Sequence, residues 1–275
     1  MRLLQHKTEA YWFYRFLSLV YDRWVNPLFW TPEMRDAALD AAGLDARGLD
    51  VLDAGAGTGF TTEGIVARVD AARVTMLDQS PHQLAQARDK PALAACAKLL
   101  GDAEALPFGD DRFDRYVSAG SIEYWPDPQR GIAEAYRVVK AGGRATVIGP
   151  VRPGNRALRA AADTWMLFPA EAEYRTWMER AGFADVRLVP VAPRWYRSRK
   201  APYAVAATGV KPAAGASPWV PEDVVLEAGR GAPMTPVRRA QFAARFVAGS
   251  LAGALFVPLG AALAARQALE ERRGR

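Results

Sequence analysis

Cysteine and histidine are almost absent from this 275-residue sequence, which contains one cysteine, Cys96, and two histidines, His6 and His82. A single cysteine excludes an internal disulfide framework and is compatible with a reducing compartment. So few cysteines and histidines leave no ligand set for a zinc site, and we expect no metal. The first seven residues, MRLLQHK, have neither the apolar core of a signal peptide nor the serine-rich composition of a transit peptide.

Charge and hydrophobicity lie close to those of an ordinary globular protein, with 24% charged and 50% hydrophobic residues. This balance argues against a disordered chain and against a long coiled coil. The formal net charge is +6, and much of the excess lies at residues 194–200 and beside an apolar run near the C-terminus. That distribution fits a membrane surface better than a groove along DNA, so we expect no nucleic-acid partner.

Short β-rich runs alternate with helical stretches from residue 49 onward. This alternation is the pattern of a parallel sheet whose strands are joined by crossover helices. Two later runs bring the expected number of strands to seven. The expected strands are 49–53, 73–77, 98–100, 113–119, 145–149, 186–189 and 203–208, and the expected helices between them are 61–69, 81–90, 130–139 and 170–181.

The two ends of the chain differ in composition from this middle part. Residues 8–30 are rich in aromatic side chains, with Tyr14 and Tyr21 at helical spacing, and predict a helix that closes over the site as a lid. Residues 246–265 carry no charge, and at about 1.5 Å per residue they can cross a bilayer of roughly 30 Å. They predict a C-terminal transmembrane helix, with an alanine-rich helix packed on the domain as the alternative. The expected organisation is a helical lid at 1–45, an α/β domain at 46–210, a linker at 211–241, and a membrane anchor with a basic tail at 242–275.

A glycine-rich turn with the sequence DAGAGTG follows the first predicted strand. Its glycines allow a sharp turn and let a ligand lie directly against the backbone. A dinucleotide-binding loop would have its third glycine at position 60, where this chain has Phe60, which weakens the alternative of an NAD-linked oxidoreductase. S-adenosylmethionine (SAM), which carries a sulfonium and a carboxylate but no phosphate, suits the pattern better. The predicted cofactor-binding residues of this turn are Asp53, Gly55, Gly57, Thr58 and Gly59.

Two further acidic residues stand at the ends of the next two predicted strands. Asp78, followed by Gln79, is placed to accept hydrogen bonds from both ribose hydroxyls of an adenosyl group. Asp102 is placed to accept from the adenine amino group, while the backbone N–H of Ala103 donates to the ring. Because the carboxyl ends of adjacent parallel strands meet in one crevice, Asp53, Asp78 and Asp102 together predict a single cofactor site.

The segment after the fourth predicted strand, SAGSIEYWPDP at 118–128, faces the methyl group of the cofactor by topology. Glu123 is the candidate proton acceptor, with Tyr124 as a possible relay, and the rings of Tyr124 and Trp125 can stack on an aromatic acceptor. The alternative is that the prolines of this segment only separate a strand from a helix. His82, at the start of a predicted crossover helix, is assigned a structural role.

With these motifs the sequence resembles the 2-methyl-6-phytyl-1,4-benzoquinol methyltransferases of tocopherol and plastoquinone biosynthesis, over nearly the whole chain. The resemblance implies a class I SAM-dependent methyltransferase with a Rossmann-like seven-stranded sheet. It also implies a plastid inner-envelope enzyme with a C-terminal membrane span, or a membrane enzyme in a plastid-free organism. The strings that carry it are HKTEAYWFYRFLSLVYD (6–22), GTGFTTEGIV (57–66), LDQSPHQLAQAR (77–88), GDAEALPF (101–108), RYVSAGSIEYWPDPQRGIAEAYRVVKAGGRA (115–145) and TWMLFPAEAEY (164–174), and the implied cofactor residues are Asp53, Gly55, Gly57, Asp78, Gln79 and Asp102.

The expected reaction is C-methylation of the ring of a prenylated benzoquinol that carries a phytyl or a solanesyl tail. A base that removes the hydroxyl proton of the quinol raises the electron density on the ring carbon, and Glu123 is the expected base. Tyr14 and Tyr21 of the lid are expected to contact the substrate. Three alternatives stay open: a different membrane quinol or lipid as substrate, a non-catalytic scaffold with the same fold, and a nucleic-acid methyltransferase that uses the basic aromatic residues 194–197. The sequence does not determine the oligomeric state.

Overall fold

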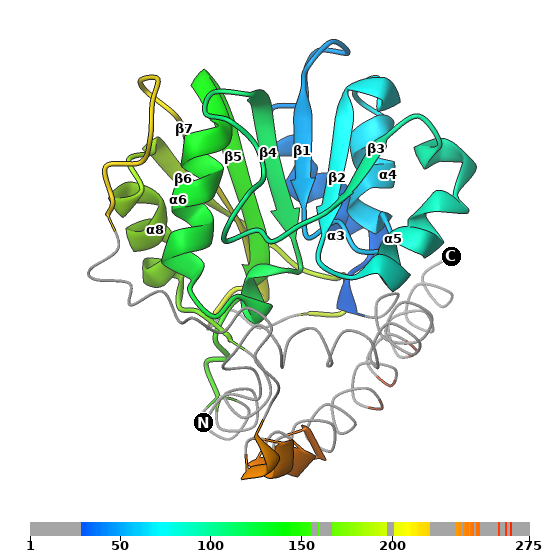
Figure 1. Ribbon diagram of the computed structural model, residues 1–275. Helices are drawn as coiled ribbons and strands as arrows, with labels where there is room; N and C mark the ends of the chain where they lie inside the picture. Colours follow the sequence, from blue (N-terminus) through cyan, green and yellow to red (C-terminus); the bar gives the residue numbers. More distant parts are fainter. Residues whose placement is uncertain are drawn as a thin grey trace, which may run out of the picture.

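In the computed structural model, the described residues are 29–155, 159, 167–196 and 201–220, with scattered positions between 235 and 265. Of the predicted lid at 1–45, residues 1–28, with Tyr14 and Tyr21, lie outside them. The described part forms one seven-stranded sheet in the order β3-β2-β1-β4-β5-β7-β6 (Figure 1), which confirms the predicted sheet. The strands are β1 (Val51–Ala54), β2 (Val74–Asp78), β3 (Ala97–Leu100), β4 (Phe113–Ala119), β5 (Val139–Pro150), β6 (Ala184–Val191) and β7 (Ala204–Val210).

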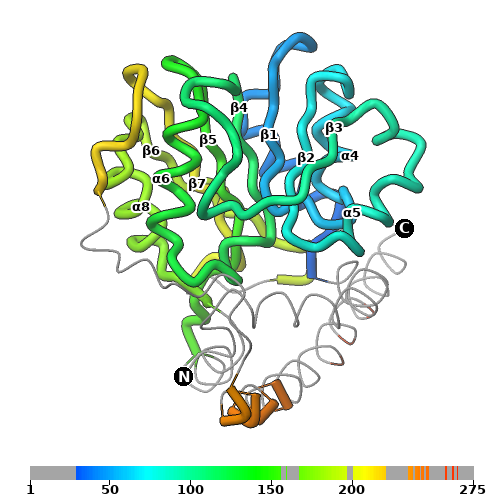
Figure 2. The backbone as a smooth tube through the Cα atoms, in the orientation of Figure 1, coloured from blue at the N-terminus to red at the C-terminus, as the bar shows by residue number. Residues whose placement is uncertain are grey.

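The first five strands are parallel, so their carboxyl ends share one edge of the sheet. β7 runs antiparallel to both β5 and β6. The crossover helices cover both faces, with α6 and α8 on one side and α3, α4 and α5 on the other (Figures 1 and 2). These helices are α3 (Pro32–Asp40), α4 (Phe60–Val66), α5 (Pro81–Arg88), α6 (Pro128–Val138) and α8 (Glu171–Arg180), and the short 3-10 helices are η2 (Ala71–Arg73), η3 (Pro91–Leu93) and η4 (Ile122–Tyr124).

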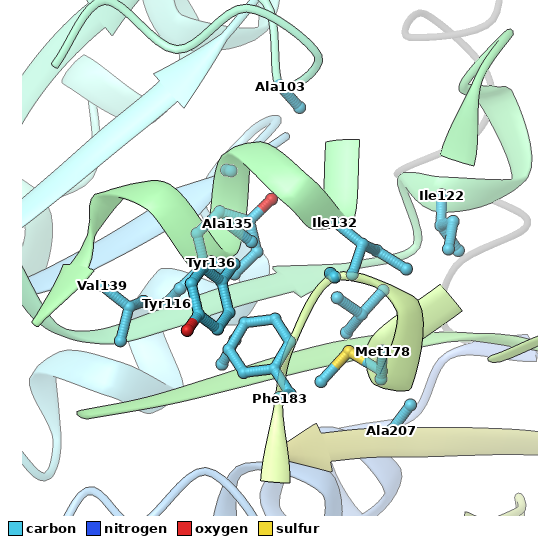
Figure 3. Close-up of a cluster of buried hydrophobic side chains, with 14 of the residues drawn as sticks. Ala103, Tyr116, Ile122, Ile132, Ala135, Tyr136, Val139, Met178, Phe183 and Ala207 are labelled. Atoms are coloured by element: carbon cyan, nitrogen blue, oxygen red, sulfur yellow. The ribbon is translucent and has the colours of Figure 1, made fainter. Parts of the chain in front are cut away.

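Alternation along the strands divides the buried side chains into two cores. In β1, Leu52 belongs to the core beneath α6 and α8, whereas its neighbour Val51 belongs to the core beneath α3, α4 and α5. Aromatic residues fill the first core, where the rings of Tyr136 and Phe183 meet edge to face at 5.1 Å (Figure 3). A sheet covered on both faces buries residues on both sides, and all four residues of β1 are buried.

Among the strands, the predicted and observed boundaries differ most at the start of the fifth strand. The fifth strand begins at Val139, immediately after α6, and not at residue 145. Gly142 and Gly143 suggest a turn, but the strand continues through them, with Gly142 at a φ of 76°. At the start of α5, the Ser80 hydroxyl accepts from the Gln83 N–H at 3.4 Å, and the backbone N–H of Ser80 donates to Asp78 Oδ1 at 2.8 Å.

Among the described residues, no helix is both long enough and apolar enough to cross a membrane. The predicted C-terminal transmembrane helix at residues 246–265 lies almost entirely outside that part of the chain, and it is not confirmed. The described positions of this run include Phe246, Val247 and Pro258.

Candidate active site

A groove opens at the carboxyl ends of β1, β2 and β3 and extends to the loop after β4. It holds about 450 Å³ of space, part of it open to solvent. Its walls come from the cofactor segments and from the predicted substrate segment together. The lining residues are Gly55, Leu77, Asp78, Gln79, Gly101, Asp102, Ala103, Glu104, Ser121, Tyr124, Trp125 and Pro126.

Asp78 holds the glycine-rich turn in place from the end of β2. Its Oδ2 accepts from the backbone N–H of Gly57 at 2.8 Å, and its Oδ1 accepts from Ser80 N–H at 2.8 Å. A carboxylate can accept about four hydrogen bonds, so these two bonds by themselves do not exclude ribose hydroxyls. Asp78 therefore lines the groove as predicted and also shapes the turn beside it.

The turn requires glycine for two physical reasons. Gly55 has a φ of 72° and Gly57 a φ of 56°, a backbone conformation that residues with a Cβ adopt only with strain. A Cβ at position 55 would also collide with Ser121 Oγ, and one at position 57 would lie 2.5 Å from Gln83 Oε1. Of the two, Gly55 lines the groove, so bare backbone forms that part of its wall.

Asp53 takes a different position from the one expected. It is completely buried, it does not line the groove, and its Oδ2 accepts from the Thr62 hydroxyl of α4 at 2.6 Å. Its Oδ1 has no hydrogen-bond partner among the described residues. Burial raises the pKa of Asp53 to about 7, and the nearby charge of Asp78 raises it further against the lowering effect of Thr62. Asp53 thus lies beneath the turn and supports it.

The loop after β3 forms the opposite wall of the groove. Asp102 and Ala103 line it as predicted, and Asp102 Oδ1 accepts from the backbone N–H of Glu104 at 2.9 Å. Glu104 is buried, and its Oε1 accepts from the backbone N–H of Asp127 in the predicted substrate segment. The two walls of the groove are therefore connected through Glu104.

The segment after β4 folds into η4 and continues to α6. The Trp125 indole Nε1 donates to Ser121 Oγ at 2.9 Å, and the Trp125 ring packs against Gly131 of α6. Trp125 is 7% exposed, so its ring lies mainly in the core and only part of it borders the groove. Its stacking role stays a prediction. Tyr124 also borders the groove.

Glu123 lies behind this wall and not on it. Its carboxyl is buried, and Oε2 has no hydrogen-bond partner within the described ranges. Burial raises the pKa of Glu123 to about 8. A buried carboxyl with a raised pKa beside a groove is a recurrent property of functional sites.

Sequence reasoning missed several of the groove residues. Ser121 and Glu104 occur inside motifs that the sequence singled out, yet their positions depend on partners at Gly55 and Asp127 that are distant in sequence. Three further predicted cofactor residues, Gly57, Thr58 and Gly59, do not line the groove; Gly59 is the N-cap of α4, with a φ of 86°.

The residues present fit SAM. A turn of bare backbone admits the ligand closely, the carboxylate of Asp78 stands beside it, and Asp102 with Ala103 lies opposite. Carboxylates around the groove also favour a cationic sulfonium electrostatically.

Comparisons with known proteins agree with this fit. Residues 52–147 match the model of a methyltransferase domain. The chain is 53% identical over 259 residues to the chloroplastic 2-methyl-6-phytyl-1,4-hydroquinone methyltransferase of Spinacia oleracea, covering 93% of this chain and 74% of that protein. It is 54% identical over 261 residues to the protein of the same name from Arabidopsis thaliana, covering 93% and 75%.

The fold is also that of solved methyltransferases. A SAM-dependent methyltransferase from Thermotoga maritima superposes with a TM-score of 0.56 at 22% identity, covering 74% of this chain and 99% of that one. This likeness confirms the predicted class I fold. The groove, the matched domain and the plant relatives together place the chain in the 2-methyl-6-phytyl-1,4-hydroquinone methyltransferase family, and it is a SAM-dependent methyltransferase.

Proposed function

We propose that this enzyme transfers the methyl group of SAM to a ring carbon of a prenylated benzoquinol, with a phytyl or a solanesyl tail. The names of relatives at 53–54% identity support a quinol of this kind. The observation that carries the proposal is the shared groove, in which the cofactor turn at Gly55 and the aromatic segment at Tyr124 and Trp125 form one continuous wall. A donor and an aromatic acceptor can therefore meet there.

Cofactor binding is proposed for the residues around this groove. Asp78 and Gln79 would hold the ribose hydroxyls, and Asp102 with the backbone of Ala103 would hold the adenine. The bare backbone at Gly55 would lie against the methionine part. When bound, SAM supplies an electrophilic methyl group. The contribution of the chain is to fix its position, because alignment of the reacting atoms near 3 Å provides much of the rate acceleration.

Glu123 is the proposed general base. It would accept the hydroxyl proton of the quinol, through Tyr124 or a water molecule, because its carboxyl lies behind the groove wall. Loss of that proton raises the electron density on the neighbouring ring carbon, which would take the methyl group as the bond from methyl to sulfur breaks and the demethylated thioether leaves. The same ring carbon would then lose its own proton to solvent, which restores the aromatic ring. A pKa near 8 makes Glu123 a stronger base than an ordinary carboxylate, and still allows it to be ionised in a useful fraction of molecules.

We extend the proposal to location. Relatives are named chloroplastic, which supports a plastid enzyme, and the uncharged run at residues 246–265 supports a contact with the inner envelope membrane. A tether of this kind would raise the effective concentration of a substrate dissolved in the same membrane. In a plastid-free organism the same argument gives a membrane-associated enzyme.

Product analysis tests the substrate. The purified enzyme is incubated with labelled SAM and with either the phytyl or the solanesyl form of the 2-methyl-6-prenyl quinol, and products are separated by chromatography and identified by mass spectrometry. A labelled ring-methylated product from at least one quinol is expected. Label in neither product, with SAM binding intact, would exclude this substrate class and favour another membrane quinol or lipid.

A further inference from the structure

The inference concerns residues 167–170, a segment without regular structure that leads into α8. Leu167 and Pro169 are buried. The backbone N–H of Leu167 donates to the carbonyl oxygen of Glu123 at 3.1 Å. The segment is thus bonded directly to the residue that carries the proposed base.

Arg152, two residues beyond the end of β5, holds the middle of this segment. Its backbone N–H donates to the carbonyl of Pro169 at 2.9 Å, and its side-chain Nε donates to the carbonyl of Phe168 at 3.1 Å. A terminal nitrogen of the same guanidinium lies 3.6 Å from Glu173 Oε2. One arginine therefore contacts two successive carbonyls of the segment and the first turn of α8.

The far end of the segment is fixed by the same group of residues. Glu173 Oε2 accepts from the backbone N–H of Ala170 at 2.8 Å, at the start of α8. The hydroxyl of Tyr174 donates to the carbonyl of Pro150, the last residue of β5, at 3.0 Å. The segment is thus held between the end of β5 and the start of α8, and at Leu167 it is bonded to the carbonyl of Glu123.

We propose that Arg152 is a positioning residue for Glu123: by holding residues 167–170 across the end of β5, it keeps the carboxyl group of Glu123 out of water. The function of that carboxyl rests on the reaction proposed above, whereas its exclusion from water does not. Arg152 does not touch the groove, so it would act only through the segment.

The charges around Glu123 favour this explanation over a direct electrostatic effect. From α8, the Tyr174 hydroxyl faces Glu123, and the charge of Glu123 contributes to the raised pKa of that tyrosine. Arg152 and Glu173 form an ion pair at the outer side of the segment, and both are more than one third exposed. Burial is the leading cause of the raised pKa of Glu123. Opening the segment would hydrate the carboxylate and lower that pKa.

The test is a direct titration of Glu123 in the full-length enzyme without substrate. Infrared difference spectra follow the protonated carboxyl band, which is assigned by its loss in Glu123→Gln. The wild type is expected to titrate near pH 8, and Arg152→Ala at least one pH unit lower. Arg175→Ala is the matched control, because Arg175 lies on α8, is exposed, and also donates to a backbone carbonyl, that of Val186 at 3.1 Å. The control should titrate as the wild type does.

An unchanged midpoint in Arg152→Ala would overturn the proposal, and so would an equal shift in Arg175→Ala. Should Arg152→Ala fail to fold, Arg152→Gln is the second variant. It keeps an N–H donor for the carbonyl of Phe168 but loses the positive charge and the several donors of the planar guanidinium. An intermediate shift of the Glu123 titration midpoint is expected. An unchanged midpoint there would equally count against the proposal. The outcome is separable from the proposed function, because a Glu123→Gln enzyme with full turnover would remove the catalytic role and leave the titration result standing.

Discussion

The indole N–H of Trp125 donates to Ser121 Oγ at 2.9 Å, and the same serine fills the space where a side chain at position 55 would lie. The glycine-rich turn and the segment after β4 are therefore packed against each other without room for a Cβ. A substitution in the glycine-rich turn should therefore also disturb the segment after β4.

Gly55→Ala should weaken SAM binding by at least about tenfold. The substitution adds backbone strain at a φ of 72° and a collision with Ser121, and together they cost on the order of 1–3 kcal/mol. Calorimetry with SAM and with its demethylated product measures the loss. Gly48→Ala is the control, because a Cβ there meets nothing within 4 Å. Equal affinities of Gly55→Ala and the wild type would show that the turn does not contact the cofactor.

Glu123→Gln should lower kcat about a hundredfold or more and leave the affinity for SAM unchanged, since a general base typically contributes a factor of this size. The ionised form is the active one, so turnover of the wild type should rise with pH through about 8. Single-turnover rates between pH 6 and 9 measure both effects. Glu179→Gln, an exposed change on α8, serves as the control. If Glu123→Gln turned over at the wild-type rate, Glu123 would not be the general base.

The stability of the fold should depend on the protonation of Asp53. The pKa of Asp53 in the folded protein is about 7, above the ordinary value of an aspartate. The stability that the protonated carboxyl contributes is therefore fully present below about pH 4 and is lost as the pH rises through 7. Asp53→Asn mimics the neutral carboxyl and should raise the free energy of unfolding at pH 8 by on the order of 1–4 kcal/mol, with a smaller effect at pH 5. Urea unfolding at the two pH values checks this. If Asp53→Asn changed the free energy of unfolding equally at pH 5 and at pH 8, Asp53 would be ionised in the folded protein at both pH values.

Deletion of residues 240–275 separates catalysis from membrane contact. The described sheet and groove lie within residues 29–220, so the shortened enzyme should still methylate a short-tailed quinol in detergent. Its co-sedimentation with vesicles should fall, because the uncharged run at 246–265 is removed. Parallel loss of both properties would refute a simple tether.

The order of strands and helices could be predicted from the sequence because the signals for it are local. Alternation of apolar runs, the proline after Thr31 and the serine at position 80 act within a few residues, and the Thr31 hydroxyl does accept from Met34 N–H at 3.3 Å. The same holds for Asp78 at the end of β2 and Asp102 after β3, since parallel strands bring their carboxyl ends to one edge.

What only the tertiary structure decided is the direction and surroundings of each side chain. Asp53 turns beneath the glycine turn toward Thr62 and away from the groove. Glu123 is buried and does not line the groove, and Arg152 reaches the segment that is bonded to its backbone. These relations join residues far apart in the chain, and the raised pKa values follow from burial, which depends on how the whole chain packs around a group and not on its sequence neighbours.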